Sequence, residues 1–138
     1  MSLFNIMAVS GSSLEAQGLR LNTIASNLAN ANSVAGSERD AYRARLPVFE
    51  TVYRDAAGER GASAGVRVRG VVESALPPRQ EYDPGHPLAD AEGYIYRPQI
   101  DAVDEMANMI AASRAYQNSV QTMNTAKQLM LRTLTLGR

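Results

Sequence analysis

Apolar and small residues recur at heptad spacing near both ends of the chain. Near the N-terminus the series consists of Met7, Gly11, Leu14, Gly18, Leu21, Ala25 and Leu28, which we call the N-helix seam. Near the C-terminus it consists of Met106, Met109, Ser113, Tyr116, Val120, Met123, Met130 and Leu134, which we call the C-helix seam. This period is typical of helices that pack against other helices along a stripe. We therefore predict one helix from Leu3 to about Asn30 and another from Ile100 to Leu134.

Between the two helices the pattern becomes that of strands and turns. Apolar and charged residues alternate in GVRVRGVVES (65–74), while RLPVFETVY (45–53) is rich in β-branched and aromatic residues. EGYIYRPQI (92–100) is a third candidate strand. The composition around 55–64 predicts a mobile loop, and YDPGHPLADAEG (82–93) predicts a rigid turn.

Proline and methionine divide the chain in the same way. All six prolines fall within 47–98, and all six methionines lie outside that interval. Proline is excluded from helix interiors, whereas methionine is a good helix former. We predict a mainly α fold in three segments: an N-terminal axial helix (1–35), a small β-rich middle region (36–99) and a C-terminal axial helix (100–138). The helices would pack as a coiled coil in an axial assembly, and Gly137 would cap the last one.

The N-terminal helix carries few charges and many amides. Residues 1–35 contain two charged side chains but five asparagines. Four of these form what we call the Asn-rich edge: Asn22, Asn27, Asn30 and Asn32. Asparagine costs a helix about 0.6 kcal/mol per position relative to alanine, so these residues need a reason. Neutral amides suit a helix enclosed by protein, where a bare charge is costly. We predict that Asn22 and Asn27 bond to neighbouring subunits, and that Asn30 and Asn32 favour a left-handed helix end.

Composition excludes several classes of protein. Fourteen basic and fourteen acidic residues cancel, so no bulk charge favours nucleic acid or an anionic membrane. There is no cysteine, and no apolar run approaches the ~20 residues of a membrane span. The N-terminus MSLFNIMAVSGSS lacks the basic region and long apolar core of a secretory signal. The protein is therefore expected to stay inside the cell or to leave by a route without a cleaved signal.

One cluster could carry chemistry. Asp83, His86 and Asp90 place two carboxylates and the single imidazole within eight residues, which could bind a metal or exchange protons. A turn whose aspartates bond to local backbone explains the same residues more simply. Arg67 and Arg69 could bind phosphate, but a solvated strand face is the simpler interpretation. We predict no catalytic residue, no cofactor and no metal.

Three blocks of sequence resemble the bacterial flagellar basal-body rod proteins, most closely the FlgC family of the proximal rod. The first is LEAQGLRLNTIASNLANANS (14–33), which is similar to the N-terminal signature of flagellar axial proteins. The second runs from VRVRGVVES through YDPGHPLADAEGYIY and NMIAASRAYQ (66–120), and the third is QTMNTAKQLMLRTLTLGR (121–138). Together they cover most of the chain.

The resemblance implies a structural, non-enzymatic protein. Members of the family pass unfolded through the flagellar type III export apparatus and assemble in the periplasm into the rod, which transmits torque from motor to hook. Their expected partners are copies of themselves, other rod proteins and the junction with the MS ring and export gate, with no nucleic acid and no membrane span. Two alternatives remain open at this point: another rod protein of the axial family, and a cytoplasmic coiled-coil adaptor.

Overall fold

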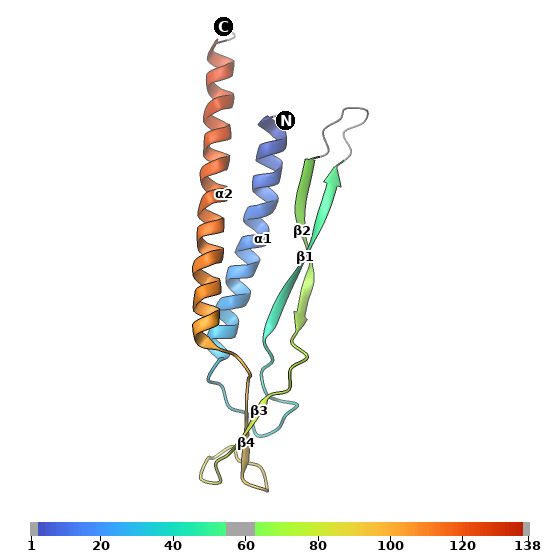
Figure 1. Cartoon of the computed structure of the whole chain (residues 1–138), viewed down its shortest axis with the longest axis vertical. Helices are drawn as coiled ribbons and strands as arrows, with labels where there is room; N and C mark the ends of the chain where they lie inside the picture. The colour runs from blue at the N-terminus through green and yellow to red at the C-terminus, as the bar shows by residue number, and fades with distance from the viewer. Residues whose placement is uncertain (1–2, 55–62, 137–138) are drawn as a thin grey trace. The chain divides into compact units, whose positions relative to one another are not determined.

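The computed structural model describes residues 3–54 and 63–136. Its elements follow the order α1 (Leu3–Asn30), β1 (Arg45–Arg54), β2 (Ser63–Glu73), β3 (Arg79–Tyr82), β4 (Tyr94–Arg97) and α2 (Ala102–Leu136) (Figure 1). The predicted fold class, two long terminal helices with small central β-hairpins, is confirmed. The predicted mobile loop lies mostly outside the described residues, and Gly137 lies outside them entirely. Neither described helix is both long and apolar enough to cross a membrane.

The chain divides into two compact units, and each contains pieces of all three predicted segments. The first unit comprises Met1–Leu21, Val48–Gly70 and Ala111–Arg138. The second comprises Asn22–Pro47 and Val71–Ile110. We describe each unit by itself.

In the first unit, α1 and α2 lie side by side and run in opposite directions (Figure 1). The hydroxyls of Ser13 and Ser119 lie 2.9 Å apart in a hydrogen bond between the helices. A Cβ at Gly11 would lie 3.7 Å from Cε of Met123, so the thioether packs against the glycine. Small residues on both helices therefore allow close packing within one chain.

The β1–β2 hairpin packs against α1 in the same unit, through Ser12. The Ser12 hydroxyl donates to the Val9 carbonyl (2.9 Å) and accepts from the Val66 backbone N–H (3.2 Å). On the hairpin itself, Arg67 forms an ion pair with Glu50. Both strands were predicted from their residue patterns, and the observed bounds agree within two residues.

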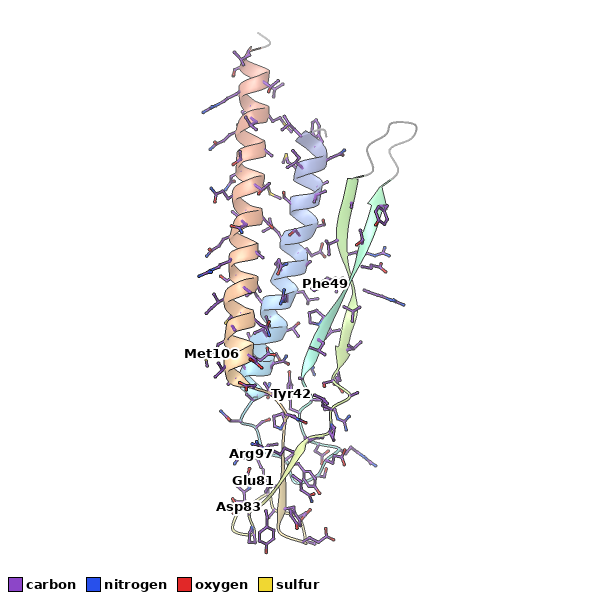
Figure 2. All side chains as sticks on the ribbon, in the orientation of Figure 1. Tyr42, Phe49, Glu81, Asp83, Arg97 and Met106 are labelled. Carbon is purple, nitrogen blue, oxygen red and sulfur yellow. The ribbon has the colours of Figure 1, made fainter. Side chains whose placement is uncertain are left out.

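In the second unit, β3 and β4 form an antiparallel pair whose register joins Arg79 to Arg97 and Tyr82 to Tyr94. Arg97 Nε lies 3.0 Å from Glu81 Oε2, so the side chains of two neighbouring strands form an ion pair (Figure 2). Strand β3 was not predicted, because RQEY has no apolar alternation; all four of its residues are exposed. Strand β4 is shorter than predicted, since four residues and not nine are paired.

The turn between β3 and β4 depends on Gly93. This residue has φ of +85°, a conformation that side-chain-bearing residues rarely adopt. A Cβ there would lie 2.9 Å from the Tyr82 ring and 3.1 Å from Cβ of Pro84. Any other residue at this position would be strained and would displace the Tyr82 ring, which packs edge-on against Tyr94 at a centroid distance of 5.2 Å.

The end of α1 differs from the prediction. No described residue other than glycine has a positive φ, so Asn30 and Asn32 do not form a left-handed cap. Ser33 ends the helix instead, since both its backbone N–H (3.0 Å) and its hydroxyl (2.8 Å) donate to the Asn30 carbonyl. Beyond this turn, Ala35 and Tyr96 exchange two backbone hydrogen bonds of 2.9 Å, which ties the connection to β4.

The start of α2 also differs by two residues. The helix begins at Ala102 rather than Ile100, because the Asp101 carboxylate accepts from the backbone N–H groups of Val103 (2.8 Å) and Asp104 (3.3 Å). An aspartate in this position satisfies helix N–H groups that have no partner inside the helix. Asp101 is therefore the N-cap.

Candidate assembly surfaces

Most residues of the N-helix seam are half-buried in the structure. Six of its members are partly covered and Ala25 is exposed. Gly11 packs against Met123, but a Cβ at Gly18 would meet no described residue within 4 Å apart from the backbone of its own helix. Among the residues that the structure describes, a packing reason therefore exists for Gly11 and not for Gly18. A role for the seam between subunits stays a prediction.

The C-helix seam divides into covered and uncovered positions. Met109, Ser113, Met123 and Met130 are half-buried, whereas the other members are exposed: Met106 (50%), Tyr116 (38%), Val120 (36%) and Leu134 (66%). Val103 (72%), Ile110 (56%) and Leu131 (54%) are further exposed apolar residues of α2. Large apolar side chains on this scale indicate surfaces that another protein covers.

The residues of α2 that face α1 were not predicted from the sequence. Ala112 and Ala126 are buried at 0% and 3% exposure, and Ser119 bonds to Ser13 of α1. These residues follow one another at sevens, three positions after Met109, Tyr116 and Met123. Their heptad spacing is visible in the sequence, but small residues indicate a buried helix face less strongly than the large apolar residues at 106, 120 and 134 do.

Asn27 is buried, with 1% of its surface exposed, and its amide bonds within the chain. Its Nδ2 donates to the Arg45 carbonyl (2.9 Å), and its Oδ1 accepts from the Arg45 N–H (2.8 Å). Oδ1 also accepts from the Tyr42 hydroxyl (3.0 Å), which lies 3.1 Å from the Ser26 hydroxyl. Tyr42, labelled in Figure 2, thus lies against the end of α1.

This arrangement corrects the prediction for Asn27. We expected partners in a neighbouring subunit, and the structure gives partners in the same chain. Asn27 pairs with Arg45 as a neighbouring strand would, and so holds the first residue of β1 against the helix. The sequence could not show this, because the partners lie 15 and 18 positions away and two of the partner groups are backbone.

The other asparagines differ from Asn27. Asn30 donates to the Ser26 carbonyl one turn back (2.8 Å), so its amide is used locally. Asn22 and Asn32 are exposed on the surface. For Asn22 a partner in a neighbouring subunit stays a prediction.

Asp83, His86 and Asp90 serve as turn residues. The His86 N–H donates to the Asp83 carbonyl (3.1 Å), and His86 Nδ1 accepts from the Leu88 N–H (3.1 Å). Asp90 Oδ1 accepts from the N–H groups of Glu92 (3.0 Å) and Tyr94 (2.8 Å). Within residues 3–54 and 63–136, no three His, Asp or Glu side chains are grouped to hold a metal ion. These hydrogen bonds to nearby backbone groups are the ones expected of a local turn.

Asp90 is the electrostatic centre of this turn. The Tyr94 N–H donates to its carboxylate and is the main cause of a lowered pKa, with smaller contributions from Glu92 N–H and the Tyr96 hydroxyl. Partial burial raises the pKa of Tyr96, and the negative charge of Asp90 raises it further. The Tyr96 hydroxyl donates to Asp90 Oδ2 at 3.3 Å.

Comparison with known proteins gives the same assignment for both ends of the chain. A family model described as "Flagella basal body rod protein" matches residues 7–36, which contain α1 from Met7 onward. A second, described as "Flagellar basal body rod FlgEFG protein C-terminal", matches residues 91–136, from the end of the turn through α2. Both matches therefore include the predicted seams.

Relatives match over the whole chain. The chain is 50% identical to "Flagellar basal-body rod protein FlgC" of Salmonella typhimurium over 138 residues, which cover 100% of both proteins. It is 49% identical to the protein of that name from Escherichia coli O157:H7, again over 100% of both, and 37% identical to that of Buchnera aphidicola subsp. Acyrthosiphon pisum over 99% of both. Membership of a rod family implies assembly with other rod proteins. The chain therefore belongs to the FlgC family of flagellar basal-body rod proteins and is a structural component of the rod, not an enzyme.

Proposed function

We propose that this protein forms part of the proximal rod and transmits torque from motor to hook. Its terminal helices would assemble helically with copies of itself and with other rod proteins, and in the cell it would meet the junction of MS ring and export gate. The N-helix seam, the C-helix seam and Asn22 are the residues we assign to these contacts.

The apolar side chains left uncovered along α2 carry this proposal. Met106 and Leu134 belong to the C-helix seam and are 50% and 66% exposed. Their neighbours Val103 and Leu131, which lie outside the seam, are 72% and 54% exposed. Exposure of several such side chains to water is unfavourable for the isolated chain, since fully burying one contributes about 1.5–3 kcal/mol of stabilising free energy. A partner that covers them recovers this energy. Packed helices with little room to slide would transmit torque.

Met106→Asp tests the assignment. Because Met106 is half exposed, the change should leave the isolated chain folded, whereas a charge at a covered contact between subunits should abolish rod assembly and swimming. Asn108→Asp adds the same charge two residues further along α2, at an exposed position on a different face of the helix, and should permit swimming. Normal swimming and normal rods with Met106→Asp would contradict the proposal.

We further propose that the protein reaches the periplasm without a cleaved signal, through the flagellar type III apparatus. The supporting observation is the full-length similarity to flagellar basal-body rod proteins. Fractionation of flagellated cells with an antibody to the chain is the test. A purely cytoplasmic pool in cells with complete basal bodies would favour a cytoplasmic adaptor instead.

A further inference from the structure

A groove of about 420 Å³ lies between α1 and α2 in the first unit. Leu3 and Ile6 of α1 form one wall, and the other wall is α2, with Thr122, Thr125, Ala126 and Leu129 among its residues. Leu129 is 48% exposed, so its apolar side chain is open to an occupant. None of the described residues that line the groove is charged.

A second surface of α2 in the same unit carries exposed apolar side chains. We call it the outer stripe, and it consists of Tyr116, Val120, Leu131 and Leu134. These side chains are 36–66% exposed. Lys127 lies between them in the helical pattern, and its aliphatic stem can lie along such a stripe while the ammonium group reaches water.

The groove and the outer stripe lie on opposite flanks of the helix. Successive residues of an α-helix are rotated by about 100°. By this count Thr122 and Leu131 are half a turn apart, and so are Thr125 and Leu134. The positions that face α1, Ser119 and Ala126, lie between the two flanks.

We infer that the outer stripe of one copy of this chain packs into the α1–α2 groove of the next copy. The inference rests on the proposed function and names one of its contacts. The floor of the groove is continuous with the α1–α2 interface, since Ala126 belongs to both and is 3% exposed. A third helix would therefore extend a helix–helix contact that already exists.

A second copy fits this role because one chain supplies both halves of the contact. The groove offers apolar side chains with an uncharged polar rim. The stripe offers two apolar pairs at helix-packing spacing, Tyr116 with Val120 four residues apart and Leu131 with Leu134 three residues apart. Two different surfaces of the same molecule make a head-to-tail contact, which continues from copy to copy unless the rotation closes it into a ring. Such a contact builds an extended assembly.

The absence of cysteine allows a direct test. The double variant Thr122→Cys with Leu131→Cys would replace the wild-type chain in cells, and purified basal bodies would be treated with a short bismaleimide. These positions are nine residues apart on opposite flanks of one helix, too far for a link within a chain, so a product joins two copies. We expect a ladder of covalent oligomers. Two single variants expressed together should give dimers and no longer products.

A matched control places both cysteines on one flank. Thr133 is exposed and lies on the same side of α2 as Thr122, so Thr122→Cys with Thr133→Cys should give no ladder. If the first pair fails to assemble, Thr125→Cys with Leu134→Cys reads out the same contact. Swimming cells whose basal bodies give no ladder, or give an equal ladder with the control, would overturn the inference and leave the proposed function intact. Absence of the wild-type chain from purified rods would overturn the proposed function itself.

Discussion

Asn27 and Arg45 pair as two residues of neighbouring strands do, although one of them lies in a helix and uses its side chain. The Asn27 amide donates to the Arg45 carbonyl and accepts from the Arg45 N–H, at 2.9 and 2.8 Å. A buried side chain with both a donor and an acceptor is needed for this pairing. Asn27 therefore fixes where β1 begins relative to the end of α1.

Asn27→Asp should destabilise the chain at neutral pH by about 1–3 kcal/mol, the usual cost of a buried polar group left without its partner. The substitution keeps the size and the acceptors, but it replaces the donor to the Arg45 carbonyl with a second oxygen. Protonation of the new carboxyl would restore a donor, so the loss should shrink as the pH falls toward 4. Urea unfolding at several pH values measures this.

Asn32→Asp is the control for that experiment, because Asn32 is exposed just beyond the same helix. It should change the stability by less than about 0.5 kcal/mol. Equal effects of the two variants would show that the Asn27 pairing with Arg45 contributes nothing specific.

Gly18→Ala should separate the stability of the chain from its assembly. Within the described part of the chain, a Cβ at this position meets nothing within 4 Å beyond its own helix backbone, so the isolated chain should gain about 1 kcal/mol from the better helix former. If another subunit packs closely against Gly18, rods should form poorly and swimming should slow. A variant that is more stable and swims normally would show that Gly18 is not a contact between subunits.

The Asp90 turn should lose stability at both extremes of pH. The lowered pKa of Asp90 means that its contribution is complete above the ordinary value of 3.8 and is lost as the pH falls through the lower folded value. The raised pKa of Tyr96 means that its contribution is complete below the ordinary value of 10.0 and is lost as the pH rises through the higher folded value. NMR titration of the Asp90 carboxyl and the Tyr96 ring measures both.

Tyr96→Phe is the control for the loss of stability at high pH, which we call the alkaline limb. It removes the ionisable hydroxyl and should abolish the part of the alkaline loss that comes from this residue, while Asp90 keeps its N–H donors from Glu92 and Tyr94. An unchanged alkaline limb would mean that other groups dominate it.

Asp101→Ala should loosen the first turn of α2 by about 1 kcal/mol, the usual cost of losing an N-cap. Hydrogen exchange should accelerate at the N–H groups of Val103 and Asp104, which the carboxylate now accepts from. Asp101→Ser keeps a capping oxygen and should preserve most of the protection. If the alanine and serine variants exchange equally, the cap does not determine the start of the helix.

The sequence by itself determined the two helices, the β1–β2 hairpin and the existence of a turn at 82–93. Heptad spacing, strand alternation and proline are local signals, since each element makes most of its own backbone hydrogen bonds or pairs with a near neighbour. The tertiary structure alone decided how residues distant in sequence meet. It assigned Asn27 to Arg45 and Tyr42, paired RQEY with β4, and chose Ala112, Ser119 and Ala126 rather than Met106, Val120 and Leu134 as the covered positions of α2. A heptad pattern shows that a helix has apolar stripes, but which of them is covered within the chain depends on the approach of the other helix, and that is fixed by packing.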